Sequence, residues 1–176
     1  PTGRNTSGVK GINLAANDAL VGMVVADPEA TLLTACAKGY GKRTLFGSNI
    51  TDSDATQISD ADAEGESESE SGAEDETSTM QRYRTQRRGG KGLRDIKTTR
   101  RNGPVIGIVR VSDNDELLMM TSRGKLQRMQ AREVSVIGRN TQGVRIMTLD
   151  EGDTLAAVVR VPREENGTEE TSGVAS

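Results

Sequence analysis

Short apolar stretches alternate with turn residues along much of the chain, a pattern that predicts β-strands. The expected strands are residues 105–111, 116–121, 126–129, 144–149 and 155–161. The first is rich in Val and Ile and follows the turn cluster Asn102-Gly103-Pro104. Residues 122–125 predict a tight hairpin between the second and the third. No segment sustains apolar residues at helical spacing, so we expect no long helices.

A sequence motif recurs along the chain. Residues 3–10 reappear as residues 138–145, and seven of the eight positions are identical or exchange only Lys for Arg. A looser third copy places residues 89–93 over residues 8–12. Internal repetition of this kind predicts a fold that is assembled from similar units.

A second part of each unit repeats as well. Residues 32–43 lie over residues 117–128, with Gly39 and Gly124 at the same position. Once the low-complexity residues 48–79 are subtracted, the spacings give a unit of about 50 residues. About four short strands per unit are typical of a propeller-like blade. We therefore predict an all-β, β-pinwheel or propeller-like repeat of four-stranded blades, of which about two and a half are present.

Charge is distributed unevenly along the chain. Residues 51–79 hold 11 Asp or Glu and no Lys or Arg, and the tail from Glu164 adds four acids and no base. Segments with this composition cannot bury enough apolar surface to fold, so we expect both to be disordered. Without them the rest carries a net charge of +12, although the formal net charge of the chain is −3. A basic body with acidic appendages indicates a polyanionic partner such as nucleic acid.

The densest basic segment surrounds Gln86-Arg87-Arg88-Gly89-Gly90-Lys91-Gly92, here called the box. Residues 81–101 hold nine Lys or Arg and one acid. Glycine permits tight turns and close approach, and Arg and Lys donate hydrogen bonds to phosphate. We expect the box to bind a phosphodiester backbone through its charges and its main-chain N–H groups. The alternative is a Gly-rich turn whose cations are merely solvated.

These residues resemble the C-terminal domain of the DNA gyrase A protein. The box matches the seven-residue motif of that domain at every position, and residues 39–44 and 137–144 agree with its flanking signatures. The resemblance covers about residues 3–47 and 81–161. It implies a six-bladed β-pinwheel whose basic rim wraps DNA with a positive crossing, so that strand passage produces negative supercoils. The box of the family usually lies in the first blade, whereas here it falls in the penultimate unit.

The resemblance also implies partners and cofactors. The chain is expected to bind double-stranded DNA and to act within an ATP-dependent type II topoisomerase, an A2B2 heterotetramer with the gyrase B protein and a second copy of the gyrase A protein. ATP and Mg would be used by other domains or by the gyrase B protein, with no cofactor or metal bound by this chain. We expect a cytoplasmic, chromosome-associated bacterial protein with no membrane contact. The start at Pro1, without an initiator Met, suggests a fragment of a longer protein.

The predicted binding residues lie in the box and along a basic rim near turns. They are Gln86, Arg87, Arg88, Gly89, Gly90, Lys91 and Gly92 of the box, with Arg94, Lys97, Arg100, Arg101, Lys42, Arg43, Arg123, Lys125 and Arg128. The alternative for the rim cations is ordinary surface charge. The predicted segments are a partial blade and the start of the next at residues 1–47, the acidic insert at 48–80, the remaining blades at 81–163 and the acidic tail at 164–176.

Catalytic residues are not expected in this chain. It contains no His, the usual general base near neutral pH, and its single Cys36 cannot form a Cys-based zinc site. Cys36 lies in an apolar run, which favours a small buried residue over a reactive thiol. Tyr83 beside the box is expected to pack or stack and not to cleave DNA.

Two functional alternatives remain open. One is the equivalent C-terminal domain of topoisomerase IV, whose family usually lacks an intact box. The other is a non-enzymatic propeller-like scaffold that binds acidic protein partners through the same rim. The acidic insert could compete with DNA for the basic rim, or it could be a solvated linker.

Overall fold

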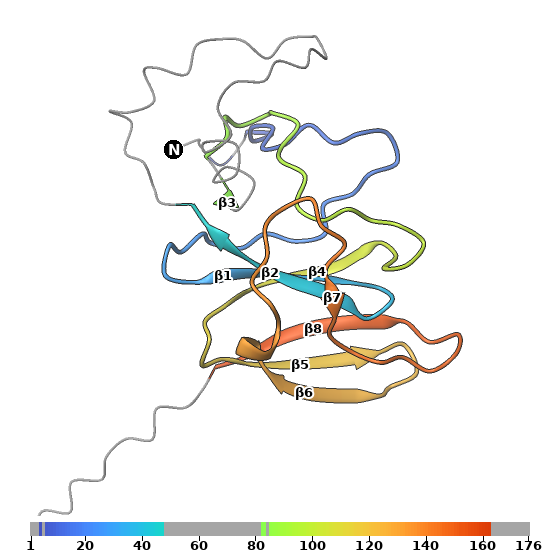
Figure 1. Ribbon diagram of the computed structural model, residues 1–176. Coiled ribbons are helices and arrows are strands. Elements are labelled where there is room, and N and C mark those ends of the chain that lie inside the picture. The colour runs from blue at the N-terminus through green and yellow to red at the C-terminus, as the bar shows by residue number, and fades with distance from the viewer. Residues whose placement is uncertain (1–3, 5, 48–81, 84, 163–176) are drawn as a thin grey trace, which may run out of the picture.

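The computed structural model describes residues 4, 6–47, 82–83 and 85–162. The acidic insert and the acidic tail lie outside the described residues, so their predicted disorder and the segment boundaries drawn there stay predictions. The described residues form two stacked β-sheets, with the N-terminal segment and the box at one end of the molecule (Figure 1).

The first sheet is built on a hairpin. Strands β1 (Thr31–Cys36) and β2 (Tyr40–Phe46) pair antiparallel, and β4 (Val105–Val111) pairs antiparallel with the other edge of β1. Two short strands complete it: β3 (Arg82–Tyr83) runs parallel to β2, and β7 (Val144–Arg145) runs antiparallel to it. The strand order is β3-β2-β1-β4, with β7 also on β2.

The second sheet repeats the hairpin and its third strand. Strand β5 (Glu116–Thr121) pairs antiparallel with β6 (Leu126–Gln130) on one edge and with β8 (Leu155–Val161) on the other. The short 3-10 helix η2 (Ala131–Glu133) follows β6. The sequence predicted β4, β5 and β8 with their observed bounds, whereas the strand expected over residues 144–149 is limited to β7.

The strand register confirms the repeat in atomic detail. Strand β4 pairs with β1 from Thr31 opposite Val111, with an irregularity just before Cys36. Strand β8 pairs with β5 from Glu116 opposite Val161, with the same irregularity just before Thr121. Each hairpin therefore receives its third strand from a later part of the chain, in the same register and with the same bulge.

One apolar stretch that matches a repeated strand does not form one. Residues 20–25 correspond to the start of β8, yet they have no strand conformation and expose large side chains such as Met23. Strands β4 and β8 each pair with a hairpin that precedes them, and no described hairpin precedes residues 20–25. In the part of the chain that the structure describes, no helix has the length and apolar character needed to span a bilayer.

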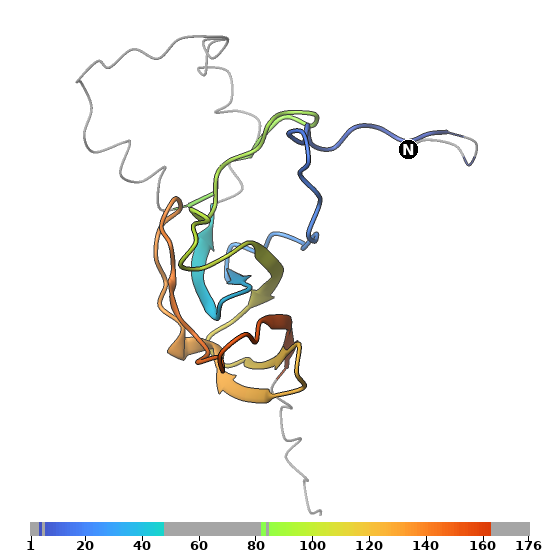
Figure 2. The same cartoon turned by 90° about the vertical axis from the view of Figure 1, so that its right-hand side faces the viewer.

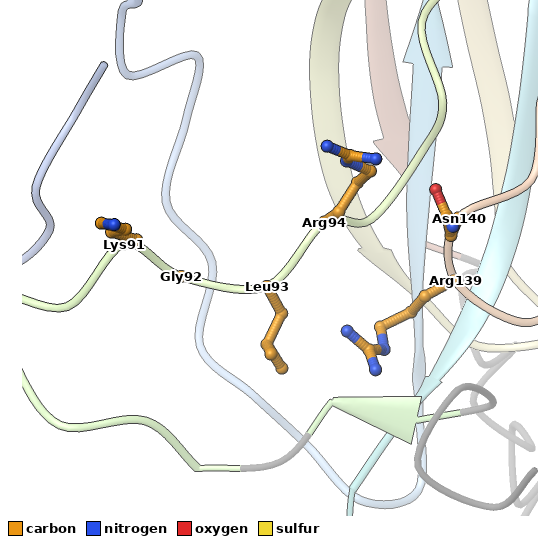
Figure 3. Close-up of a pocket in the computed structure, with 6 residues that line it drawn as sticks. All are labelled: Lys91, Gly92, Leu93, Arg94, Arg139 and Asn140. Atoms are coloured by element: carbon orange, nitrogen blue, oxygen red, sulfur yellow. The ribbon is translucent and has the colours of Figure 1, made fainter. Parts of the chain in front are cut away.

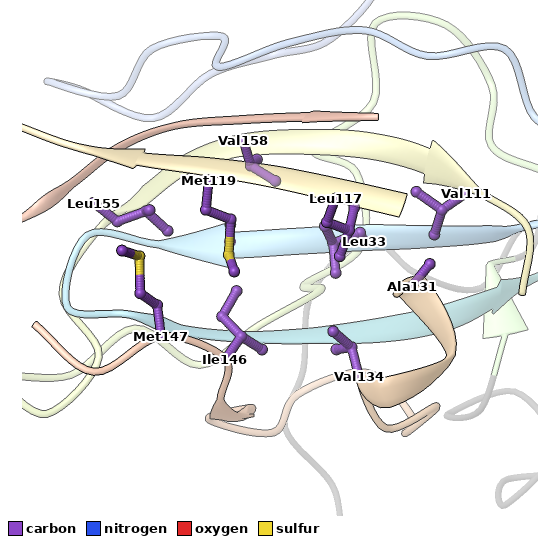
Figure 4. Packing of buried hydrophobic residues seen from close by; sticks show 11 residues of the cluster. Leu33, Val111, Leu117, Met119, Ala131, Val134, Ile146, Met147, Leu155 and Val158 are labelled. Atoms are coloured by element: carbon purple, nitrogen blue, oxygen red, sulfur yellow. The ribbon is translucent and has the colours of Figure 1, made fainter. Parts of the chain in front are cut away.

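The main core lies between the two sheets (Figure 4). Leu33 from β1 and Leu117 and Met119 from β5 are fully buried there, together with Leu155 from β8. Successive residues of a strand point to opposite faces, and every residue of β1 is buried, so both faces of β1 are covered. Leu32 packs in a second cluster with Phe46. Burial on both faces makes β1 the central strand of the assembly.

Cys36 lies at the end of this central strand and is completely buried. Burial raises the pKa of its thiol to about 11, and the negative charge of Asp95 adds to the rise. A thiol with so high a pKa is protonated at neutral pH and is a poor nucleophile. The prediction of a small buried residue is confirmed.

The turn between β1 and β2 depends on Gly39. Its φ is +75°, and a Cβ at this position would lie 2.2 Å from the carbonyl oxygen of Met147. Gly124 occupies the same place in the β5–β6 hairpin with φ +84°, but its Cβ would meet nothing within 4 Å. The two glycines therefore share a backbone requirement and differ in packing.

We predict that Gly39→Ala destabilises the protein by about 3 kcal/mol, because it adds overpacking to the strain of a left-handed residue. Gly124→Ala should cost only about 1 kcal/mol, since it adds strain alone. Urea unfolding midpoints of the two variants measure the difference. Equal losses would show that the contact with residue 147 relaxes without cost.

Candidate nucleic-acid interface

The box forms an exposed loop. Its turn is closed by the N–H of Gly90, which donates to the carbonyl oxygen of Arg87 at 3.4 Å, and Gly89 takes φ +78° within it. The side chains of Gln86, Arg87, Arg88 and Lys91 are exposed. The glycines thus serve the turn, and the cations project from it.

The backbone of the box is held by an earlier part of the chain. The N–H of Gly89 donates to the carbonyl oxygen of Gly11 at 2.8 Å, and the N–H of Asn13 donates to that of Gly90 at 2.8 Å. These contacts place the box alongside the N-terminal segment, as Figure 2 shows. The N–H groups of Gly89 and Gly90 are therefore already engaged. The expectation that the box grips phosphate with its main-chain N–H groups is wrong for these two.

The same pair of backbone bonds recurs one unit later. The N–H of Asn140 donates to the carbonyl oxygen of Asp95 at 2.6 Å, and the N–H of Lys97 donates to that of Thr141 at 2.8 Å. Matching the two pairs places Gly92 in register with Gly143. The predicted alignment, which placed Gly89 over Gly8, is therefore three residues out of register. Gly92, Gly143 and Gly8 have φ of +78°, +75° and +75°.

The corrected register reveals a repeated charge pattern. In all three copies a basic residue lies four positions before the shared glycine (Gly8, Gly92 or Gly143), and another lies two positions after it. The pairs are Arg4 and Lys10, Arg88 and Arg94, and Arg139 and Arg145. The box adds Arg87 and Lys91 to this pattern, at positions that are Gly138 and Gln142 in the next copy. The box is an ordinary connection of the repeat that carries two extra cations.

The box continues into an open cavity of about 540 Å³. Lys91, Gly92, Leu93 and Arg94 line one side, and Arg139 with Asn140 lines the other (Figure 3). Arg139 was not among the predicted binding residues. Its place in the repeated motif, equivalent to that of Arg88, is the sequence signal that could have found it.

Most predicted cations near the box are exposed. This group comprises Arg87, Arg88, Lys91, Arg94, Lys97, Arg100 and Arg101. Within the described residues, no ion pair joins any of them to a carboxylate. The segment therefore keeps its positive charge at the surface, which is the property that attracts a polyanion.

The predicted cations of the β5–β6 hairpin are also exposed, but they have partners. Lys125 pairs with Asp150 at 3.0 Å, and Arg128 pairs with Glu116. Arg123 donates to the carbonyl oxygen of Glu151 at 3.0 Å. Two of these three charges are thus balanced by carboxylates, so this hairpin contributes less to the basic surface than its sequence predicts.

Lys42 and Arg43 are not on the rim, contrary to the prediction. Lys42 is completely buried, and Arg43 is 4% exposed. The Lys42 ammonium pairs with Asp95 at 2.9 Å and donates to the carbonyl oxygen of Gly138 at 2.9 Å. Arg43 pairs with Asp113 and donates from Nε to the carbonyl oxygen of Val134 at 2.8 Å. Both side chains hold strands together and are not presented to a ligand.

Asp95 is the centre of this buried network. Besides Lys42 it accepts hydrogen bonds from the hydroxyl groups of Thr34 and Tyr83. Burial lowers the pKa of Lys42, and the hydrogen bond and charge of Asp95 oppose that shift. Burial also raises the pKa of Tyr83, as does Asp95. The packing role predicted for Tyr83 agrees with this position. Asp95 lies three residues after the box and fixes its exit to the first sheet.

Known proteins are similar to this chain in sequence and in fold. Residues 1–27, 81–112 and 115–162 match the family described as DNA gyrase C-terminal domain, beta-propeller. The chain is 36% identical over 173 residues to the DNA gyrase A protein of Haloquadratum walsbyi, covering 97% of this chain and 16% of that protein. It is 34% identical over 159 residues to the DNA gyrase A protein of Escherichia coli K12, covering 90% of this chain and 14% of that protein.

Two solved structures are similar to the described fold. A DNA gyrase A C-terminal domain matches with a TM-score of 0.64 and 25% identity, over 90% of this chain and 43% of that one. The C-terminal domain of a DNA topoisomerase IV matches with a TM-score of 0.62 and 16% identity, over 88% of this chain and 38% of that one. The second likeness concerns the fold alone. The chain thus spans about a sixth of the curated relatives and less than half of the solved domains.

Proposed function

Since the chain belongs to the family described as DNA gyrase C-terminal domain, beta-propeller, we propose that it wraps duplex DNA for a type II topoisomerase, DNA gyrase, and so supports negative supercoiling. The observation that carries this proposal is the exposed charge of the box, which forms no ion pair with any described carboxylate, on a loop whose backbone is already fixed by hydrogen bonds. A fixed backbone presents the cations without the cost of ordering a flexible loop on binding.

The proposed contacts are to phosphates and not to bases. The described residues contain no α-helix that could enter a major groove, and the cations lie on loops. Contacts to the backbone tolerate any sequence and allow the duplex to bend along the surface. This mode suits a domain that presents a curved DNA segment to a catalytic core.

The remaining steps are proposed for the rest of the protein. We place ATP hydrolysis and Mg binding in other domains or in the gyrase B protein, within an A2B2 heterotetramer, and DNA cleavage outside this chain. In this proposal the chain sets the path of the DNA and takes no part in DNA cleavage or ATP hydrolysis. It decides which DNA segment reaches the core and with which sign of crossing.

The test is topological. The full-length protein is incubated with nicked circular DNA, the nick is sealed, and the linking number is measured. Wrapping shifts the linking number in proportion to the bound protein, whereas a scaffold for acidic proteins leaves it unchanged. Assays with ATP and the gyrase B protein then separate gyrase from topoisomerase IV, because only gyrase supercoils relaxed DNA. An unchanged linking number refutes DNA wrapping.

We predict a strong dependence of DNA affinity on salt. If six to ten phosphates are neutralised, affinity falls by about 10³–10⁵-fold between 50 and 200 mM salt, because condensed counterions are released on binding. Binding titrations of the full-length protein on duplexes of unrelated sequence measure this slope. A shallow slope together with a strong sequence preference would contradict phosphate recognition.

A further inference from the structure

A second cationic cluster lies away from the box, around Tyr40. The guanidinium groups of Arg101 and Arg145 lie over the Tyr40 ring, 5.0 and 5.5 Å from its centroid. Arg101 Nε donates to the Tyr40 hydroxyl at 3.2 Å, and Arg145 Nη2 donates to it at 3.1 Å. One phenol thus organises two arginines, which come from different repeats of the chain.

The backbone holds both arginines in place. Arg145 is the direct cross-strand neighbour of Tyr40 in the β2–β7 pair (Figure 1). This crossing is close because Gly143 approaches Gly41, where a Cβ on Gly143 would lie 2.7 Å from the Gly41 carbonyl oxygen. On the other side, Arg101 precedes the fully buried Asn102. The arginines are therefore positioned before any ligand arrives.

Asn102 fixes the Arg101 loop through several hydrogen bonds. Its side-chain amide donates to the carbonyl oxygens of Lys97 and Gln142, both at 3.0 Å. Its main-chain carbonyl oxygen accepts from the N–H of Lys38 at 3.0 Å, in the β1–β2 turn. The loop before β4, the β1–β2 turn and the segment before β7 are thereby joined at one edge of the first sheet.

The repeat supplies an internal comparison for this cluster. Tyr40 and Lys125 are each the first residue after the hairpin glycine, Gly39 or Gly124. In the second unit Lys125 is neutralised by Asp150, from the loop before β8. In the first unit the loop before β4 supplies Arg101, and no carboxylate pairs with Arg101 or Arg145 among the described residues. The charges of Arg101 and Arg145 at the first hairpin are therefore not balanced among the described residues, whereas the charge of Lys125 at the second hairpin is balanced by Asp150.

The hydroxyl of Tyr40 is left as a donor. It accepts one hydrogen bond from each arginine, which uses both lone pairs of the oxygen. Tyr40 is 6% exposed and its ring packs with Cys36 and Ile96, and the hydroxyl proton has no acceptor among the described residues. Hydrogen bonds from Arg101, and then from Arg145, lower the pKa of Tyr40 to about 8. A more acidic phenol is a stronger hydrogen-bond donor.

We propose that Tyr40, Arg101 and Arg145 form a phosphate-binding site for the DNA backbone, separate from the box. The two guanidinium groups supply charge and forked donors, and the phenol supplies a third donor, a set that suits the oxygens of a phosphodiester. The inference rests on the proposed wrapping function and adds a point of contact at the sheet edge where β2 meets β7. It assigns roles to Tyr40 and Arg145, which the sequence did not suggest.

The test uses the full-length protein and duplex DNA. Tyr40→Phe removes the hydroxyl, both as a donor to phosphate and as the acceptor that holds the two arginines, without changing charge or ring packing. Arg145→Lys keeps the charge but loses the fork. Each should raise the Kd by about 10-fold, the scale of one charge-assisted hydrogen bond. Arg101→Gln should in addition lower the salt slope by about 0.9, the value for one phosphate contact. The control Arg132→Gln, which removes an exposed cation on η2, should change the Kd by less than about 2-fold.

Measuring DNA affinity at different pH values tests the contribution of the Tyr40 phenol separately. Between pH 7 and 9 the Tyr40 phenolate forms, loses its donor and repels phosphate, while the arginines that face it stay protonated. Wild-type affinity should therefore fall more over this range than that of Tyr40→Phe. If Tyr40→Phe and Arg145→Lys both bind as wild type does, the site is refuted although wrapping stands. If the wild type itself fails to shift the linking number, the proposed function fails first.

Discussion

Replacing Arg87, Arg88 and Lys91 together by Ala should abolish DNA supercoiling by the assembled full-length enzyme while relaxation and DNA cleavage continue. The three side chains are exposed, and none forms an ion pair within the described residues, so their loss should not unfold the domain. Loss of three phosphate contacts would lower the salt slope by about 2.7 and affinity by orders of magnitude near physiological salt.

Supercoiling of relaxed plasmid in the presence of ATP measures this prediction, and cleavage-complex formation by the same preparation is the positive control. Arg132→Ala is a matched loss of an exposed cation outside the box and should supercoil normally. Urea unfolding should show the triple variant to be as stable as the wild type. A triple variant that supercoils at the wild-type rate would move the wrapping surface away from the box.

The hairpins could be predicted from sequence because their signals are local. Strands β4, β5 and β8 are bounded by turn residues and carry β-branched or alternating apolar side chains. Gly39 and Gly124 mark equivalent turns, and the structure gives both a positive φ. Local turn chemistry and side-chain alternation are sufficient for elements of this length.

The register of the box could not be predicted in this way. Three glycines within four positions offer several alignments with the other copies. Against residues 8–12, residues 89–93 are identical at three of five positions and residues 92–96 at two, so local identity with that copy favours the wrong register. The choice is made by backbone bonds from Gly89 to Gly11 and from Asn140 to Asp95, between residues far apart in the chain. These long-range contacts establish that the basic positions at Arg88 and Arg139 are equivalent, an equivalence that the shared spacing of Arg and Gly in residues 88–92 and 139–143 also indicates.

The buried cations were missed for a related reason. A strand that reads Gly41-Lys42-Arg43-Thr44 looks half exposed, and charged side chains are rarely buried without partners. The partners, Asp95 and Asp113, lie beyond the acidic insert and cannot be assigned from sequence. The cations of the box are exposed, as a dense run of like charge predicts, and their role in binding stays a prediction.

Asp95→Ala should be the most destabilising of the single substitutions considered. It leaves the Lys42 ammonium fully buried without its carboxylate, at a cost of about 3–5 kcal/mol. It also removes the acceptor of the Thr34 and Tyr83 hydroxyl groups. Asp150→Ala, which breaks the exposed pair with Lys125, is the matched control and should cost less than about 1 kcal/mol.

The pH dependence of stability tests the Lys42–Asp95 pair in a second, independent way. Burial already lowers the pKa of Lys42, and removal of Asp95 takes away the interactions that oppose this shift. The unfolded chain then binds more protons than the folded one over a wider range above neutral pH, so the stability of Asp95→Ala should rise more steeply with pH than that of the wild type. Urea unfolding at pH 7 and pH 9 measures both quantities.

A double variant separates the buried charge from the lost hydrogen bonds. Lys42→Met combined with Asp95→Asn should recover much of the stability that Asp95→Ala loses, because it removes the buried charge itself. If the stability of the double variant is not recovered, the loss comes from the hydrogen bonds that the hydroxyl groups of Thr34 and Tyr83 donate to Asp95. An Asp95→Ala variant within about 1 kcal/mol of the wild type at both pH values would show that the Lys42–Asp95 pair does not anchor the exit of the box.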